Sequence, residues 1–197
     1  MSGTTYAEAG PLIETLKRVA AALKKAKIPF ALGGGYAVYA RGGHESLHDV
    51  DFMLLQEDVE EALSALTDAG LRPVRPPEDW LVKAYDDDRL VDLIFRPVNR
   101  PVTREQLARA EELGVGSVQM PVLSATDLVV YKLLSFDEHN CDFATALPVV
   151  RALREQVDWP SVRADVAASP FAQAFLVLAE QLDLVPREAT PSREQVA

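Results

Sequence analysis

Two aspartates, Asp49 and Asp51, stand one residue apart in an otherwise apolar stretch that runs to Leu55. Burying carboxylates among apolar side chains is costly unless a cation meets them. In a β-strand alternate side chains share a face, so the two carboxylates point the same way, about 6.6 Å apart along the strand. Two carboxylates in this arrangement can converge on a divalent cation, and the pair therefore predicts a metal site.

A third aspartate, Asp92, lies in the apolar segment RLVDLIF, residues 89–95. A neighbouring strand could bring it beside Asp49 and Asp51, and we call these three residues the aspartate triad. Mg²⁺ binds few protein carboxylates and completes its shell with water and substrate phosphates, and Mn²⁺ shares its preference for oxygen. Three such carboxylates around one site are the minimum set of side chains for metal-assisted phosphoryl or nucleotidyl transfer. In the structural alternative, Asp92 caps a hairpin or pairs with Arg96.

Three consecutive glycines, Gly33, Gly34 and Gly35, precede the acidic pair. Because they lack side chains, they let backbone N–H groups and a helix N-terminus approach a phosphate closely. Arg41 follows a short apolar segment, residues 36–40. It could contact a triphosphate, or it could simply end a short helix with a charge that is favourable near a helix C-terminus.

The elements that must position these residues follow from the hydrophobic pattern. Apolar residues recur at helical spacing from Leu12 to Leu23, and Pro29 ends this first helix. Up to residue 123, short strands then alternate with helices. We expect strands at 28–32, 50–55, 79–86, 89–95 and 117–123, and helices at 36–40, 57–70 and 104–113. The polar residues 86–88 predict a hairpin turn between two of the strands.

From Ser124 onward the pattern is helical, with segments expected at 124–136, 142–157 and 169–182, the second of them perturbed by Pro148. Asp142 could cap one of these helices, or it could reach back into the site. We therefore predict an α/β (α+β) protein. Its parts are a core over residues 1–122, a C-terminal helical layer over 123–186 and a disordered tail over 187–197.

The composition bounds the class of protein. With 197 residues, 48% of them hydrophobic, the chain is long enough to bury a proper core. It contains no run of about 18 apolar residues and no signal-peptide pattern at its start, so we expect a cytoplasmic protein without a membrane partner. Its net charge of −10 argues against a broad nucleic-acid-coating surface but leaves room for a local basic cleft.

The order of these motifs resembles the nucleotidyltransferase fold of the DNA polymerase β superfamily, a mixed sheet with flanking helices. Residues 32–54, LGGGYAVYARGGHESLHDVDFML, are similar to a segment of the aminoglycoside 2''-nucleotidyltransferases and of the nucleotidyltransferase-type toxins of toxin–antitoxin systems. The similarity extends to LVDLIF, residues 90–95, and more loosely to MPVLSATDLVVYKLL, residues 120–134.

The resemblance implies a nucleotide-binding enzyme that transfers a nucleoside monophosphate from a nucleoside triphosphate, such as ATP, to an acceptor hydroxyl. Gly34 and Gly35 would hold the triphosphate, and the first two aspartates of the triad would bind Mg²⁺ or Mn²⁺. Asp92 would deprotonate the acceptor hydroxyl or complete the metal site. Lys132 would meet phosphate charge, unless it is a surface lysine of an amphipathic helix. His48, beside the acidic pair, would line the rim of the site.

The sequence departs from the family pattern in two places. A glycine stands where the commoner Gly-Ser motif has serine, which removes one hydroxyl contact. Leu47 replaces a serine or threonine that some toxin relatives carry two positions before the first aspartate, and this replacement weakens the toxin interpretation.

Three interpretations of the function remain open from the sequence. The excess of acidic over basic residues favours a small-molecule acceptor of the aminoglycoside type. The alternative is a toxin that modifies the 3' end of tRNA and has an antitoxin protein as its partner, and it needs a basic strip. Arg72, Arg75, Lys83, Arg89, Arg96, Arg100 and Arg104 could supply that strip. A third interpretation is a non-catalytic nucleotide-binding or regulatory module, against which the complete triad argues.

Overall fold

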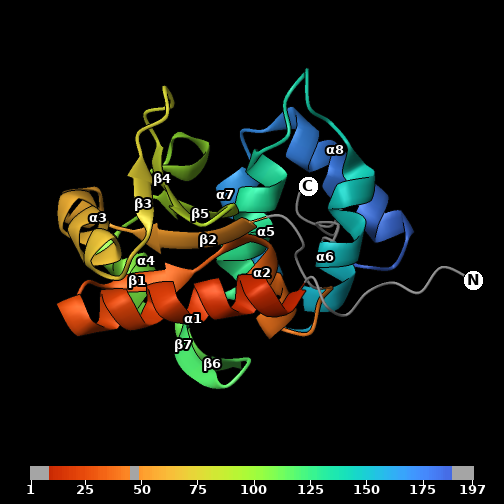
Figure 1. The fold of residues 1–197 in the computed structure, drawn as a ribbon. Coiled ribbons are helices and arrows are strands. Elements are labelled where there is room, and N and C mark those ends of the chain that lie inside the picture. Colours follow the sequence, from red (N-terminus) through yellow and green to blue (C-terminus); the bar gives the residue numbers. More distant parts are fainter. Residues whose placement is uncertain (1–8, 45–48, 188–197) are drawn as a thin grey trace, which may run out of the picture.

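A mixed sheet forms the centre of the molecule (Figure 1). The computed structural model describes residues 9–44 and 49–187, and within them the sheet has seven strands in the order β3-β4-β5-β2-β1-β7-β6. The strands are β1 (Phe30–Leu32), β2 (Asp49–Leu54), β3 (Arg72–Val74), β4 (Leu81–Asp86), β5 (Arg89–Ile94), β6 (Glu111–Val115) and β7 (Val118–Val122). The predicted α/β class is confirmed.

Helices cover the sheet and extend beyond it. They are α1 (Ala9–Ala26), α2 (Gly34–Ala40), α3 (Val59–Asp68), α4 (Arg104–Ala108), α5 (Ala125–Leu134), α6 (Leu147–Leu153), α7 (Trp159–Val166) and α8 (Pro170–Gln181). Three short 3₁₀ turns, η1 (Gln56–Asp58), η2 (Pro97–Asn99) and η3 (Phe143–Thr145), join them. In Figure 1, α1 runs along the sheet, where it contacts β2 and β5, whereas α5 to α8 gather on the side of the molecule away from α3.

The pairing of β2 sets the position of the acidic residues. β2 runs parallel to β5, with Asp51 opposite Asp92, and antiparallel to β1, with Phe52 opposite Leu32. β4 and β5 form the predicted hairpin, in which Lys83 lies opposite Asp92. The acidic residues therefore lie on central strands of the sheet, where the register holds them.

The core forms where apolar faces of the helices meet the sheet. Leu16 and Leu23 of α1 are fully buried, as their helical spacing predicts, and so are Phe52 of β2 and Leu93 of β5. Within the described residues, no helix has both the length and the apolar character needed to cross a membrane.

The structure corrects two expected elements. The helix predicted over 104–113 ends at Ala108, and its second half instead forms β6, which pairs with β7 around a turn at Gly116. The helix predicted over 142–157 is also wrong as one segment, because α6 begins only at Leu147. Pro148 lies in the first turn of α6, where its missing N–H costs no helical hydrogen bond.

Two further expectations concern the organisation of the chain. The last strand ends at Val122 and α5 begins at Ala125. The division into a core and a helical layer stays a prediction. Most of the predicted tail, residues 188–197, lies outside the described residues.

Candidate active site

The aspartate triad comes together on β2 and β5. Asp51 pairs in register with Asp92, and Asp49 lies two residues earlier on β2. One carboxylate oxygen from each of the three residues lies within 4.8 Å of the others. Between the two acids of β2, Val50 points to the core and is fully buried, as the predicted alternation requires. Three hard oxygen donors at this separation are a donor set that suits Mg²⁺ or Mn²⁺.

The electrostatics of the triad also fit a cation. The pKa of Asp51 is raised from its ordinary value of 3.8 to about 7, chiefly because burial disfavours the charged form, and then because Asp49 and Asp92 repel it. Lys83 and the N–H of Gly35 offset only part of this effect. Burial raises the pKa of Asp92 as well. The cluster therefore carries negative charge that the surrounding side chains do not fully compensate.

Lys83 is the direct cationic partner of Asp92. Its Nζ lies 3.0 Å from Oδ1 and 3.3 Å from Oδ2 of that carboxylate, across the β4–β5 hairpin. The alternative pairing of Asp92 with Arg96 is wrong, because Arg96 pairs with Asp79 at 2.6 Å. Sequence reasoning missed Lys83 as the partner of Asp92, although the length of the turn indicates this pairing. A two-residue turn after Asp86 places residue 83 opposite residue 92.

Replacing Lys83 with methionine is expected to raise the pKa of Asp92 further. Lys83 lowers this pKa through its hydrogen bond and its charge, while burial raises it. NMR titration of the Asp92 carboxyl carbon in metal-free protein would measure the change. Lys83→Arg keeps the charge and should stay close to wild type. An unchanged pKa in Lys83→Met would contradict the assignment of Lys83 as the partner of Asp92.

The glycines hold Asp51 from the other side. The N–H of Gly33 donates to the main-chain oxygen of Asp51 at 2.8 Å, and the N–H of Gly35 donates to the Asp51 carboxylate. Gly34 has φ +52°, and a Cβ placed there would lie 1.7 Å from Asp51 Oδ2. A side chain at Gly34 is therefore excluded by both the backbone conformation and the carboxylate.

A cavity of about 380 Å³ adjoins Asp51, between the sheet and the helices α5 and α6. Gly34, Gly35, His44 and Asp51 line it together with Tyr131 and Lys132 of α5. Its remaining lining is apolar and consists of Val38, Met53, Ile94, Leu128, Pro148 and Val149. The cavity thus brings together two of the predicted glycines, one aspartate of the triad and the predicted lysine.

Lys132 is half-buried in this lining. Burial lowers the pKa of its ammonium, and the charge of Asp142 partly opposes that shift. Its Nζ lies 5.8 Å from the centroid of the Phe136 ring, and it forms no ion pair with any residue in the described ranges. A cation without a carboxylate partner beside the cavity is suited to meet an anionic ligand.

Arg41 is not part of the cavity lining, and the structure assigns it a structural role instead. Its guanidinium is buried, with Nε donating to the main-chain oxygen of Leu123 at 2.7 Å. Nη2 pairs with Glu111 at 2.9 Å, and Nη1 reaches Gln156 at 3.2 Å. We therefore leave Arg41 out of the proposed nucleotide-binding residues, because its donors already join α2 to β6, β7 and the segment after α6.

Arg41→Leu is expected to lower the free energy of unfolding by about 2–4 kcal/mol, because it removes charge-assisted hydrogen bonds from buried acceptors. Urea unfolding would measure the loss, with the exposed Arg151→Leu as a control that stays near wild type. A folded Arg41→Leu protein of unchanged stability that has lost nucleotide affinity would instead restore Arg41 to the binding site.

Two candidate residues remain, Asp142 and His48. Asp142 is exposed and caps η3, since its carboxylate accepts a hydrogen bond from the N–H of Ala144 at 3.0 Å. The cap predicted for it is therefore present, and Asp142 does not belong to the cavity lining among the described residues. His48 and Leu47 lie outside the described residues.

The predicted basic strip is largely neutralised within the described part of the chain. Six of its seven members pair with a carboxylate, and Arg72 stacks on Tyr85. The pairs are Arg75–Glu60, Lys83–Asp92, Arg89–Asp86, Arg96–Asp79, Arg100–Asp165 and Arg104–Glu57. Such pairing leaves less free positive charge to attract a nucleic-acid backbone.

The model of a protein family described as an uncharacterised nucleotidyltransferase matches residues 6–184 of the chain. No curated protein matches it.

Several solved structures share the fold. The crystal structure of ANT(2")-Ia in complex with adenylyl-2"-tobramycin is 17% identical, with 84% of this chain and 97% of that chain covered, and has a TM-score of 0.59. The solution structure of ANT(2'')-Ia is 18% identical, with coverages of 89% and 98% and a TM-score of 0.62. The lincomycin-bound lincosamide antibiotic adenylyltransferase LnuA is 12% identical, with coverages of 69% and 92% and a TM-score of 0.50.

Proposed function

Because the chain belongs to the nucleotidyltransferase family whose model covers residues 6–184, we propose that it is a metal-dependent enzyme acting on a small molecule. It would transfer a nucleoside monophosphate from a nucleoside triphosphate to a hydroxyl of this acceptor. The observation that carries the proposal is the aspartate triad, whose carboxylate oxygens lie within 4.8 Å of one another, next to a cavity that also contains Lys132.

The triad would hold the metal. Its oxygen donors fit Mg²⁺ or Mn²⁺, and its uncompensated negative charge favours binding a cation. When bound, such an ion would supply positive charge that offsets the negative charge developing during nucleotidyl transfer.

The side chains of the protein would perform the other steps. In the reaction the acceptor oxygen forms a bond to the α-phosphorus, and the bond from this phosphorus to the bridging oxygen of pyrophosphate breaks. Asp92 would accept the proton of the acceptor hydroxyl and later release it to solvent, with Lys83 holding the carboxylate in place. Lys132 would stabilise charge on the triphosphate, and Gly34 and Gly35, which have no side chains, would leave room for it.

A small-molecule acceptor is favoured over tRNA by the charges of the described residues. Six of the seven basic residues suggested for RNA binding are paired with carboxylates, and the chain has a net charge of −10. ANT(2")-Ia and LnuA, which share the fold, are described with an adenylylated aminoglycoside and with lincomycin. We therefore propose ATP and an antibiotic-like polyhydroxyl compound as the first pair to test.

Transfer of label would test this proposal. The protein is incubated with Mg²⁺ and each α-labelled nucleoside triphosphate, together with either a panel of aminoglycosides and lincosamides or total tRNA. Label is expected in a small molecule, with release of pyrophosphate. Labelled tRNA would overturn the small-molecule acceptor and favour the toxin. Metal-dependent nucleotide binding with no transfer to either pool would contradict the enzymatic claim and favour a binding module.

A further inference from the structure

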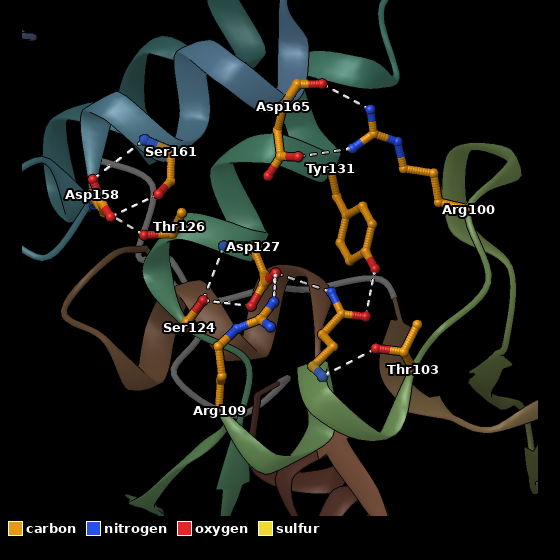
Figure 2. A network of polar contacts seen from close by, with 11 residues as sticks. Arg100, Thr103, Arg109, Ser124, Thr126, Asp127, Tyr131, Asp158, Ser161 and Asp165 are labelled. Atoms are coloured by element: carbon orange, nitrogen blue, oxygen red, sulfur yellow. Dashed lines mark hydrogen bonds and ion pairs between the residues drawn. The ribbon is translucent and has the colours of Figure 1, made fainter.

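A chain of hydrogen bonds fixes one wall of the cavity. Figure 2 shows the Tyr131 ring extending from α5 within a network of polar contacts. Its hydroxyl donates to Oε1 of Gln106 on α4 at 2.8 Å. Nε2 of Gln106 in turn donates to Oδ1 of Asp127 at 3.1 Å. Gln106 is buried, and its main-chain N–H bonds to the hydroxyl of Thr103 at 3.2 Å. Gln106, whose side-chain amide holds Tyr131, is therefore itself fixed by hydrogen bonds to Asp127 and Thr103.

The direction of these hydrogen bonds is determined by Asp127. Its carboxylate also accepts from Ser124 Oγ at 2.6 Å and from Arg109 at 3.1 Å. Because a carboxylate only accepts, Gln106 must turn its NH₂ group toward Asp127 and its oxygen toward Tyr131. The Tyr131 hydroxyl must then be the donor. Burial raises the pKa of this hydroxyl, which keeps the proton that the bond needs.

The anchored ring belongs to the cavity beside the triad. Leu128, Tyr131 and Lys132 are spaced at i, i+3 and i+4 along α5, so they share one face of the helix, and all three line the cavity. Tyr131 supplies the one phenol ring among the described lining residues, which also include the imidazole of His44, and most of its neighbours there are apolar. The cavity thus offers a flat, fixed, apolar surface next to the lysine assigned to phosphate charge.

We propose that Tyr131 is the wall on which the nucleobase of the nucleoside triphosphate stacks, and that Gln106 is the residue that positions it. This inference rests on the proposed function, because it takes a nucleotide as the ligand of the cavity. A planar base has an aromatic face to stack on a tyrosine. A polycationic acceptor fits the cavity less well, because Asp51 is the one carboxylate in its described lining and Lys132 would repel it. The acceptor then approaches the triad from outside this cavity.

Two ligands and two Tyr131 variants test the stacking. Tyr131→Leu is expected to weaken ATP binding in the presence of Mg²⁺ about 5- to 100-fold, the range for loss of a base-stacking aromatic. Ribose 5-triphosphate, which has no base, should bind this variant as it binds wild type when used as a competitor. Tyr131→Phe keeps the ring but loses its anchor, so it should weaken ATP binding only about 2- to 10-fold.

The positioning role of Gln106 is tested by a double-mutant cycle. Gln106→Leu should match Tyr131→Phe, raising KM for ATP with little change in kcat. The double variant, Gln106→Leu with Tyr131→Phe, should bind ATP no more weakly than whichever single variant binds it less tightly, because both substitutions remove the same hydrogen bond. Thr15→Val is the matched control. It removes another buried hydrogen bond, to Asp86, and should lower stability without changing KM.

The outcomes separate this inference from the proposed function. Failure of wild-type protein to bind any nucleoside triphosphate would remove the proposed function itself. Wild-type protein that binds ATP, with a Tyr131→Leu variant that binds it equally well, would overturn only the inference. So would equal losses of ATP and ribose 5-triphosphate. If Gln106→Leu does not fold, Tyr131→Phe and Tyr131→Leu still decide the role of the ring.

Discussion

Asp51→Asn is expected to abolish nucleotide transfer and to stabilise the metal-free protein at neutral pH. The activity should fall by on the order of 10³-fold or more, because a metal ligand supports several kcal/mol of transition-state charge stabilisation. The stability should rise because the native structure holds this carboxyl between two like charges in a buried setting. Each kcal/mol of relieved repulsion should raise Tm by about 2–4 °C.

The expected difference in stability between wild type and Asp51→Asn depends on pH. The pKa of Asp51 lies at 3.8 in the absence of the fold and at about 7 within it. Between these values the folded protein binds more protons than the unfolded chain, so its free energy of unfolding falls as the pH rises. Wild-type protein in EDTA should therefore lose stability relative to Asp51→Asn from about pH 4 to pH 7, a window set by these two values.

Thermal unfolding of both proteins across this pH range measures the difference, first in EDTA and then with Mg²⁺. Added metal should stabilise wild type and leave Asp51→Asn unchanged. Asp68→Asn, at an exposed position on α3, is the control and should match wild type in its pH dependence and in its stabilisation by Mg²⁺. Retained turnover in Asp51→Asn, or a lower stability than wild type at neutral pH in EDTA, would contradict the account of the triad.

Gly34→Ala should inactivate the protein almost as completely. The new Cβ would lie 1.7 Å from Asp51 Oδ2 and 2.5 Å from its Cγ, so the carboxylate must move. The positive φ of +52° adds about 1–2 kcal/mol of backbone strain for a residue with a Cβ. We expect loss of Mg²⁺ stabilisation and a fall in activity of at least about 100-fold, since the displaced carboxylate no longer supports transition-state charge.

Gly70→Ala is the control that separates backbone strain from the contact with Asp51. Gly70 also has a positive φ, of +89°, but a Cβ there would meet nothing within 4 Å. It should cost stability through backbone strain alone and leave nucleotide transfer and metal binding at wild-type levels. A Gly34→Ala protein that behaves like Gly70→Ala, less stable but active, would show that the contact with Asp51 is unimportant.

The parts of the site that rest on local pattern were predictable from sequence. An apolar strand that carries Asp49 and Asp51 on one face needs a counter-charge, and this need does not depend on the rest of the fold. The helix of Lys132 was likewise predicted from its helical pattern after Ser124, and the structure shows Ser124 capping α5. The role of Lys132 stays a prediction.

The parts that depend on distant contacts were not predictable. Arg41 reads as a free cation near a phosphate site, but its acceptor on Leu123 lies 82 residues away in sequence. β6 reads as the end of a helix, because only its pairing with β7 makes residues 111–115 extended. The bond from Tyr131 to Gln106 spans two elements whose separate patterns carry no sign of it.

Isothermal titration calorimetry with Mg²⁺ and each nucleoside triphosphate would show whether the aspartate triad holds a nucleotide through a metal. We expect that at least one triphosphate binds wild-type protein, that EDTA removes most of this binding, and that Asp51→Asn loses the metal dependence. Absence of binding by all four common nucleoside triphosphates would contradict this expectation. So would binding that neither EDTA nor Asp51→Asn affects, because the aspartate triad would then have no part in holding the nucleotide.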